Sequence, residues 1–355
     1  MQKILGPSID HLIENHDFDF QLCVDFHYCT IKVFCNNGEL HQELSNYFKE
    51  FLCGHSSATM DIYAIEDGNF KMDDEFQIKQ PDAGKSKIKE AFCDFPDGKA
   101  VHKVTTGMYL LFTNDRNMAI GPCLKNPNQV INFVNNRFIE FMLNNNNLLF
   151  HSSGVSLNGN GIAISGFSGK GKSTLALHIM NHGLDFVSND RLLVCDRGQD
   201  LEMFGVVKYP RINPGTIINN EKLLPILTPD QIAEYKKLPS DELWTLEDKY
   251  DGFIDELYGI DKFKISAKMK ALVVLNWDRN DSPLQISEIQ LADRPHLFEA
   301  FMKTPGLFYL PTGNGWPDLS KEKYQEYLKK CKVFEVTGGV DFEKASQFFI
   351  NFLKK

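Results

Sequence analysis

The amino-acid sequence predicts an α/β protein in two parts: a domain with a mixed central sheet flanked by helices, and a smaller α/β region before it. Two observations lead to this prediction. A glycine-rich loop at residues 166–173 stands between a β-prone run and a helical stretch, an order of elements typical of phosphate-binding folds. Further on, Ala271–Trp277 (ALVVLNW) is a continuous apolar run, which indicates a buried central strand.

The first part of the chain, residues 1–126, contains strand-like segments and one amphipathic stretch. Phe20–Phe34 alternates apolar and mixed residues, and we interpret the Asn36-Asn37-Gly38 that follows as a hairpin-type turn. Glu39–Leu52 has apolar residues at helical spacing. Two further strands are expected, at Met60–Ile65 and Met108–Thr113. We therefore expect mostly antiparallel strands here, in a region that recognises a substrate, forms an oligomer interface or extends the main sheet.

An amphipathic helix is expected at Asn128–Leu143, where apolar residues recur at helical spacing and a run of four asparagines follows. We place the domain boundary near residue 126. The helix is then the first element of the second domain, residues 127–355.

The glycine-rich loop matches the phosphate-binding pattern G-x-x-x-x-G-K-[ST] without a mismatch. Glycines that take positive φ expose backbone N–H groups, so the loop can wrap a polyphosphate at the start of a helix. Lys172 supplies a positive charge for the β- and γ-phosphates of ATP, and Ser173 a hydroxyl for Mg²⁺. The candidate ATP-binding residues are Gly166, Phe167, Ser168, Gly169, Lys170, Gly171, Lys172, Ser173 and Thr174.

A second element follows the loop. The helix beginning at Thr174 is expected to end at Gly183, and Leu184–Ser188 indicates a short strand that delivers Asp190 at its carboxyl end. A carboxylate at that position holds the metal in nucleotide-binding folds, directly or through water. Ser173 and Asp190 are therefore the candidate Mg²⁺ ligands.

The loop at residues 204–216 contains two basic residues, two prolines and a glycine. One interpretation is a rigid segment that directs Lys208 or Arg211 at phosphate oxygens. The other is a surface turn with solvated cations. The sequence does not decide between them.

We expect the remaining segments of the second domain to form ordinary surface and core. Residues 239–258 are rich in Asp and Glu, which favours a solvated face or lid over a docking site for a basic partner. A lysine-rich helix at Ser320–Lys332 and a strand at Val333–Val336 precede a Gly338-Gly339 turn. Asp341 is a suitable N-cap for a last helix, whose apolar stripe we assign to the core. The stripe consists of Phe342, Ala345, Phe348, Phe349 and Phe352.

Composition narrows the classes of partner. The 355 residues carry a formal net charge of −9, which gives no overall positive field for nucleic acid or an anionic membrane. No apolar stretch approaches the roughly 18 residues that span a bilayer, and the N-terminal segment contains acidic residues where a signal peptide would be basic and then apolar. We expect a cytoplasmic protein.

The eight cysteines are dispersed, and none forms C-x-x-C. We expect reduced thiols rather than a metal site or disulfides. Cys23, Cys29 and Cys35 share strand parity, so some of them are expected to face a core.

Several motifs together resemble a known family. His151-Ser152-Ser153-Gly154-Val155, the stretch GFSGKGKSTLALHIMNHGLDFVSNDR and the run ALVVLNW are similar to the catalytic domain of HPr kinase/phosphorylase. The segments SNDRLLV, KYPRINPGT, LNW and VTGGVDFE resemble more closely the HPr-kinase-related kinase B family. The resemblance covers about residues 128–355.

The resemblance implies a P-loop kinase core of the HPr kinase C-terminal domain type. It places His151 and Asp190 near the γ-phosphate of ATP, with Asp190 as a metal ligand or as the base that takes the acceptor proton. A packing role for His151 remains an alternative. The related kinases form hexamers, so the resemblance also implies a homo-oligomer.

Two positions depart from the family pattern. Asn189 stands where the family has the first residue of an acidic pair, which leaves Asp190 to act alone and does not imply the reverse, phosphorylase reaction. Thr174 stands where the family has Glu. The identity of the acceptor is not implied either.

The expected activity is ATP-dependent phosphoryl transfer to a hydroxyl group of a protein Ser or Thr or of a small molecule. Lys172 and Arg211 would neutralise the charge on the transferred group, while Asp190 orients metal and acceptor. Two alternatives stay open: a nucleotide-dependent ATPase switch, and a pseudokinase that binds ATP without chemistry.

Overall fold

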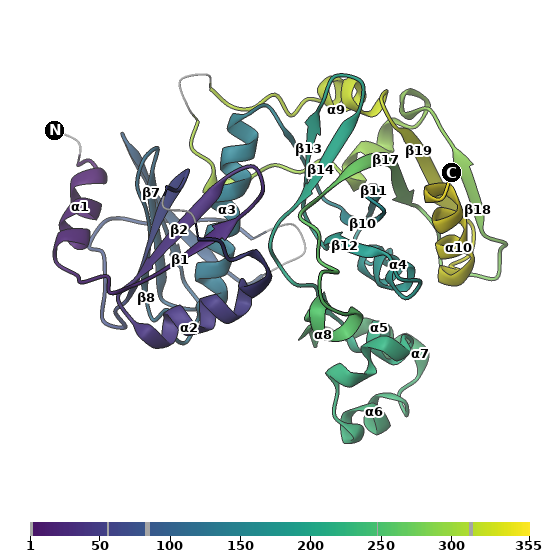
Figure 1. Ribbon diagram of the computed structural model, residues 1–355, viewed down its shortest axis with the longest axis horizontal. Coiled ribbons are helices and arrows are strands. Elements are labelled where there is room, and N and C mark those ends of the chain that lie inside the picture. The colour runs from purple at the N-terminus through teal and green to yellow at the C-terminus, as the bar shows by residue number, and fades with distance from the viewer. Residues whose placement is uncertain (1–2, 55–56, 82–85, 247, 312–314) are drawn as a thin grey trace. The chain divides into compact units, whose positions relative to one another are not determined.

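The computed structural model describes residues 3–54, 57–81, 86–246, 248–311 and 315–355. The chain divides into two compact α/β units, each with its own mixed sheet (Figure 1). Unit 1 comprises residues 1–144 and 305–317. Unit 2 comprises residues 145–304 and 318–355.

Unit 1 is built on a sheet that has eight strands in the described ranges, in the order β1-β2-β3-β8-β7-β6-β5-β4. β3 pairs in parallel with β2 and β8, and the other pairs are antiparallel, as the sequence mostly predicted. In sheet order the strands are Phe20–Asp25, Thr30–Cys35, Met60–Glu66, Asn117–Gly121, Met108–Thr113, Gly98–Lys103, Glu90–Phe95 and Gln77–Ile78. The helical segments are α1 (Gly6–Glu14), α2 (Gly38–Tyr47), η1 (Lys49–Phe51), α3 (Pro127–Asn144) and η5 (Gly306–Phe308).

One turn prediction in unit 1 is wrong. The run Phe20–Phe34 forms two strands, β1 and β2, and the turn between them lies at residues 26–29. His27 has a φ of 65°, and its N–H donates to the Asp25 carboxylate at 2.6 Å. Asn36-Asn37-Gly38 is no hairpin turn, because the Asn37 side chain accepts hydrogen bonds from two backbone N–H groups in the first turn of α2. Asn is favoured both in turns and at helix N-caps. In the folded protein Asn37 is the N-cap.

The helix α3 belongs to unit 1, which differs from the expected boundary near residue 126. Its Phe138 ring stacks on Phe26 at 4.5 Å, and its Arg137 guanidinium lies 4.1 Å from the Phe112 ring centroid. The apolar face that the sequence revealed thus packs on the first sheet and its loops. Amphipathicity indicates that a helix is buried, but not against which sheet.

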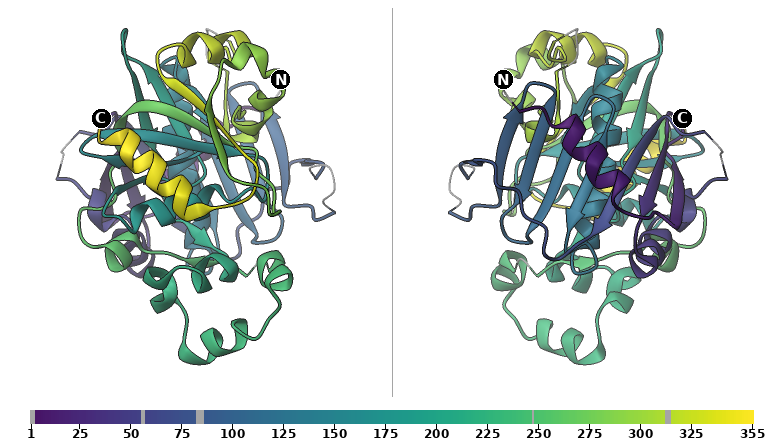
Figure 2. Two further views of the ribbon diagram at one scale, coloured as in Figure 1. Left: turned by 90° about the vertical axis from the view of Figure 1, so that its right-hand side faces the viewer. Right: turned by 90° about the vertical axis from the view of Figure 1, so that its left-hand side faces the viewer.

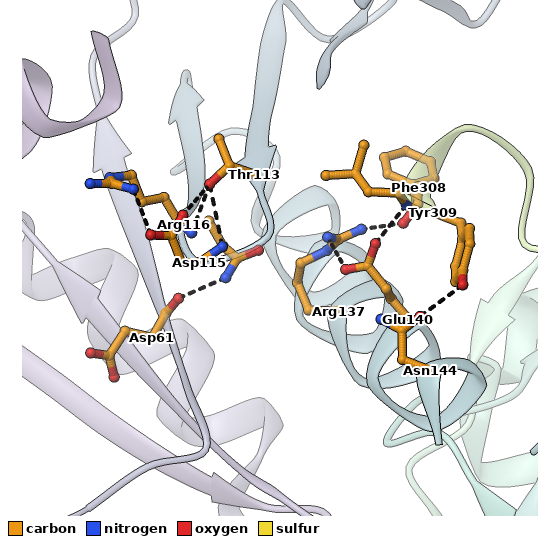
Figure 3. A network of polar contacts seen from close by, with 11 residues as sticks. Asp61, Thr113, Asp115, Arg116, Arg137, Glu140, Asn144, Phe308 and Tyr309 are labelled. Atoms are coloured by element: carbon orange, nitrogen blue, oxygen red, sulfur yellow. Dashed lines mark hydrogen bonds and ion pairs between the residues drawn. The ribbon is translucent and has the colours of Figure 1, made fainter. Parts of the chain in front are cut away.

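A buried ion pair in unit 1 binds the backbone of Phe308 and Leu310, two residues of the returning segment (Figure 3). Arg137 is fully buried, lies 2.5 Å from Glu140 and donates to the carbonyl of Phe308. Glu140 also accepts the N–H of Leu310 at 2.7 Å. Burial lowers the pKa of Arg137 and raises that of Glu140, while the charge of each opposes the shift of the other. Each charge therefore compensates in part for the hydration that the other loses on burial.

Unit 2 contains a sheet of nine described strands, of which seven run in the order β12-β10-β11-β17-β14-β13-β9. These strands are Asp185–Ser188, Ser153–Leu157, Asn160–Gly166, Ser266–Leu275, Leu201–Gly205, Leu192–Asp196 and Leu148–Phe150. β19 (Lys332–Thr337) pairs with β17 and with β18 (Gln285–Glu288), while β15 (Arg211–Ile212) and β16 (Tyr250–Asp251) form a separate pair.

The central strand β17 confirms the prediction of a buried strand in this stretch. Residues 271–275 are fully buried, as expected for a strand covered on both faces. Its first half pairs antiparallel with β14 and its second half pairs in parallel with β19, while β11 runs parallel along its other edge. The carboxyl ends of β11 and β17 therefore meet at one edge of the sheet, where Gly166 is the register partner of Leu275.

The long helices of unit 2 pack beside each other. α10 (Phe342–Leu353) lies against α4 (Lys172–Met180), as Figures 1 and 2 show. Asp341 caps α10 by accepting the Lys344 N–H at 3.0 Å, which confirms the predicted cap. The predicted apolar stripe is only partly core, since Phe348 is 40% exposed. The other helical segments are α5 (Pro214–Ile218), η2 (Glu221–Ile226), α6 (Pro229–Tyr235), α7 (Ser240–Thr245), α8 (Ile254–Tyr258), η3 (Leu291–Asp293), η4 (Pro295–Ala300) and α9 (Lys321–Leu328).

The acidic segment 239–258 forms α7, β16 and α8, which are anchored by buried Leu243 and Ile254. Figure 2 shows α6 and α7 set apart from the strands of the unit 2 sheet. The described acidic side chains are exposed except for half-buried Asp255, which agrees with a solvated face; Glu247 lies outside the described residues.

All eight cysteines are free thiols in the structure. Cys23, Cys29 and Cys35 are all buried, and burial raises the pKa of each thiol to about 12. Among the described helices, none combines the length and the apolar character that crossing a membrane requires.

The Arg137–Glu140 pair generates a stability prediction. Glu140→Leu leaves the Arg137 charge buried without its partner, so we expect unit 1 to lose roughly 3–5 kcal/mol of unfolding free energy. The double variant Arg137→Met/Glu140→Leu removes both charges and should lose less. Urea unfolding of the three proteins measures the difference. A double variant as unstable as the single one would show that the buried charge is not the cause.

Candidate functional site

The phosphate-binding loop connects β11 to α4, as the sequence predicts. A Cβ at Gly166 would lie 2.9 Å from the carbonyl oxygen of Leu275, so the close approach of the two strands requires glycine there. Gly169 and Gly171 have φ angles of 77° and 83°, which side chains with a Cβ rarely adopt. The loop therefore has the backbone that the motif calls for.

Aromatic side chains support the end of the loop. A Cβ at Gly171 would lie 2.9 Å from the Phe342 ring. That ring stacks on His178 of α4 at 5.2 Å and meets Trp277 edge to face at 5.2 Å. Phe342, expected only as core, thus also fixes the position at which α4 begins.

Lys170 ties the loop to the residues after β17. Its ammonium group donates to the Asp278 carboxylate at 2.6 Å and to the Trp277 carbonyl at 2.9 Å, and the Trp277 indole N–H donates back to the Lys170 carbonyl at 2.8 Å. The Lys170 side chain therefore holds the loop in position through these hydrogen bonds.

The Lys172 ammonium group is within the loop, where it donates to the Gly166 carbonyl at 3.0 Å. Burial lowers its pKa, and the nearby charge of Asp190 opposes that shift. Ser173 is half-buried in the first turn of α4, while buried Thr174 shares a hydrogen bond of 2.8 Å with Thr216.

The remaining two loop residues differ in exposure. Phe167 is half-buried and packs against the apolar core of unit 2, whereas Ser168 is exposed. Ser168 is thus free of the core to contribute its hydroxyl and N–H to a ligand.

His151 and Asp190 meet at the ends of β9 and β12. Nε2 of His151 lies 3.1 Å from Oδ1 of Asp190. The His151 N–H donates to the Phe301 carbonyl at 2.7 Å, and the Ser153 hydroxyl donates to the Asn189 carbonyl at 2.5 Å. Both segments are therefore fixed by hydrogen bonds to backbone carbonyl groups.

The Asp190 carboxylate is 57% exposed. Partial desolvation would raise its pKa, but the hydrogen bond and charge of His151, with the charges of Arg191 and Lys208, hold the pKa well below its usual range. Asp190 is consequently ionised at neutral pH and is the acceptor of hydrogen bonds at the site.

The two basic side chains of the loop at residues 204–216 have different environments. Arg211 is 55% exposed, lies 3.4 Å from Asp251 and donates to the Lys249 carbonyl at 3.2 Å. Lys208 is half-buried and close enough to Asp190 for their charges to interact. The charges of Asp190, Asp251, Arg191 and Arg211 all act on Lys208, so both basic side chains of this loop lie among the charged groups around Asp190 and Asp251.

Two further cations join the site. Arg191 follows Asp190 in the chain, and its Nε lies 3.7 Å from the Asp190 carboxylate. Lys303 interacts through its charge with Lys172. Arg191 could have been singled out from its place in the SNDR motif, whereas no sequence pattern marks Lys303, which only the fold brings there.

The residues present fit a magnesium ion that a nucleotide carries. No cluster of three or more His, Cys, Asp or Glu side chains suited to a metal occurs in the part of the chain that the structure describes. Mg²⁺ at phosphates keeps several waters and needs only one or two protein ligands, which Ser173 and Asp190 can supply. In addition, Oδ1 of Asn189 is buried without a hydrogen-bond partner among the described residues, so the amide can still accept a hydrogen bond from a bound water.

No protein-family model and no curated protein matches this chain. Among solved structures, it is similar to the HPr(Ser) kinase/phosphatase from Coxiella burnetii, with a TM-score of 0.30 and 12% sequence identity. The match covers 58% of this chain and 87% of that one.

The contact between Gly171 and Phe342 leads to a prediction on loop stability. Gly171→Ala should destabilise unit 2 by roughly 2–4 kcal/mol, because it adds steric overlap with the ring to the strain of positive φ. Gly159→Ala, at a φ of 77° with open space around it, is the matched control and should lose only about 1–2 kcal/mol. Urea unfolding compares them, and Phe342→Leu should relieve part of the Gly171→Ala effect. Equal losses in both glycine variants would exclude the steric contribution.

The low pKa of Asp190 generates a prediction on pH. Its carboxyl ¹³C resonance should titrate below the ordinary value of about 3.9, and His151→Ala should move the midpoint upward. Because the folded state favours the charged form, the stabilising contribution of Asp190 is complete above about pH 3.9 and is lost as the pH falls below it. His296→Ala, which removes an exposed histidine, should leave the midpoint unchanged. An unshifted midpoint in His151→Ala would contradict the pairing.

Proposed function

We propose that unit 2 binds Mg²⁺·ATP on residues 166–174 and transfers the γ-phosphoryl group to a hydroxyl acceptor. The observation that supports this most directly is the His151–Asp190 pair, which stands beside the ammonium group of a complete phosphate-binding loop. A loop alone would serve any nucleotide-binding protein. A histidine and an ionised carboxylate at its mouth add the groups that handle an acceptor proton.

The loop residues provide the phosphate contacts in this proposal. The exposed N–H groups around Gly169 and the first turn of α4 face a polyphosphate. Lys172 leaves the Gly166 carbonyl and follows the β- and γ-phosphates. Ser173 and Asp190 would hold Mg²⁺, and the ion would supply positive charge to neutralise the phosphates.

Asp190 orients the acceptor. Its carboxylate accepts a hydrogen bond from the hydroxyl, whose oxygen forms the new bond to phosphorus while the bond to the leaving ADP oxygen breaks. A carboxylate of low pKa is a weak base, yet phosphoryl transfer through a loose transition state demands little proton abstraction at the start. The proton ends on Asp190 or on His151, which lies within hydrogen-bond distance of it.

We propose Lys208 as the cation that stabilises charge on the transferred group, in the place given to Arg211 from sequence. Lys208 is half-buried and its charge interacts with that of Asp190 as well as Asp251, whereas Arg211 is exposed and lies 3.4 Å from Asp251. A planar guanidinium would bind two phosphate oxygens at once, but an ammonium group also serves as a point charge.

ATP hydrolysis is the second candidate, because the 57% exposure of Asp190 also admits water as the acceptor. The pseudokinase alternative depends on Asn189, and Asn189→Asp tests it. Activation by that change would indicate an impaired site.

Transfer of radiolabelled γ-phosphate tests the proposal. The purified protein is mixed with a lysate of its source, and wild type is compared with Lys172→Ala and Asp190→Ala. We expect Lys172→Ala to weaken ATP binding roughly tenfold or more, since it removes the charge that follows the phosphates. Asp190→Ala should still bind ATP but lose transfer by roughly 10²–10⁴-fold. Lys270→Ala, at an exposed position on β17, is the control and should behave as wild type.

The label identifies the product class. A labelled protein or metabolite that disappears in both variants would support the kinase. Free phosphate alone, lost in Lys172→Ala, would support the ATPase. A wild-type protein that does not bind ATP would exclude both.

A further inference from the structure

Two cysteine side chains of unit 1 are in direct contact. The Sγ atoms of Cys23 and Cys53 lie 3.1 Å apart, and the Cys53 thiol donates a weak hydrogen bond to the Cys23 sulfur. Both residues are free thiols in the structure. They stand 30 positions apart in the chain, so the fold and not a local motif brings them together.

Backbone pairing aligns the two residues. Val24 and Leu52 form an antiparallel β-bridge, and the N–H of Cys53 donates to the Cys23 carbonyl at 2.9 Å. This register sets Cys23 directly opposite Cys53, with both side chains on one face. Opposite residues of such a pair have Cα atoms about 5.5 Å apart, a separation that a disulfide spans. The two sulfur atoms can therefore bond without a rearrangement of the backbone.

The two thiols differ in their access to solvent. Cys23 is only 8% exposed, whereas Cys53 is half-buried and is flanked by exposed Leu52 and Gly54. A reagent in solution therefore reaches Cys53 first. Burial and, to a smaller extent, the Cys53 thiol raise the pKa of Cys23 to about 12. Modification of Cys53 removes the second of these causes, which favours Cys23 as the thiol that reacts second.

We propose that Cys23 and Cys53 form a reversible disulfide when the protein meets a low-molecular-weight disulfide such as oxidised glutathione. The Cys53 thiolate attacks one sulfur of this reagent, whose S–S bond breaks and releases one glutathione. The Cys23 sulfur then attacks the Cys53 sulfur of the mixed disulfide, which releases the second glutathione. The two thiol protons end on the two released glutathione molecules, so one oxidised glutathione is consumed for each disulfide formed.

The disulfide stabilises one edge of unit 1. It links two residues 30 positions apart, and the stretch between them contains β2 and α2. A cross-link of this kind restricts the unfolded chain more than the folded one. It also fixes Leu52 and Cys53 beside β1, which is the first strand in the order of the unit 1 sheet. The inference concerns unit 1 and does not depend on the proposed function.

Peptide mapping tests the disulfide on the full chain. The protein is incubated with oxidised glutathione, the remaining thiols are alkylated under denaturing conditions, and its peptides are compared by mass spectrometry before and after reduction. We expect a peptide that links Cys23 to Cys53 and disappears on reduction. In Cys23→Ala, Cys53 should retain glutathione, because the second step is missing. Cys93→Ser, which removes a half-buried thiol elsewhere in unit 1, is the control and should form the disulfide as wild type does.

Thermal unfolding tests the stabilisation. Oxidised wild type should unfold roughly 5–10 °C above the reduced protein, and Cys53→Ser should show no such difference. Equal unfolding temperatures of oxidised and reduced wild type would overturn the stabilising role.

The mapping of wild type alone decides whether the disulfide forms, so the test does not depend on the folding of a variant. Glutathione retained on wild-type Cys53, without the linked peptide, would overturn the proposal. So would the absence of any modification at Cys53.

Discussion

The parallel pairing of β11 with β17 is the constraint on which the site depends. It sets Gly166 against the Leu275 carbonyl, with no room for a Cβ. The chain must then turn away from the sheet, and the turn becomes the phosphate-binding loop. The same edge carries Trp277, whose indole and carbonyl hold Lys170. Backbone hydrogen bonds between two buried strands thus determine where the exposed N–H groups of the loop stand.

The local parts of this arrangement could be predicted from sequence, because short-range patterns encode them. The glycine loop, its strand and helix, the buried strand at 271–275 and the cap at Asp341 all depend on neighbours in the chain. Asn36-Asn37-Gly38 was misassigned since the same residues suit a turn and a helix cap. The helix α3 was attributed to the second domain because an amphipathic pattern does not indicate which sheet the helix packs against.

The site itself was predicted in part. The motif marks the loop residues, and the resemblance marks His151 and Asp190, which the structure places 3.1 Å apart. The environments of Lys208 and Arg211 depend on strand packing at Gly205 and on the pairing of Arg211 with Asp251, neither of which is local. Lys303 reaches the site only through tertiary contacts.

The path of segment 305–317 bears on how the protein can be dissected. The chain leaves unit 2 after residue 304, contributes this segment to unit 1 and returns at residue 318. A fragment that begins at residue 145 would therefore carry Tyr309 and its neighbours without the helix that covers them. One that ends at residue 144 would contain the charges of Arg137 and Glu140 without the backbone groups they bind. Residues 1–144 alone therefore lack part of unit 1, whereas residues 145–355 contain all of unit 2 together with a segment of unit 1.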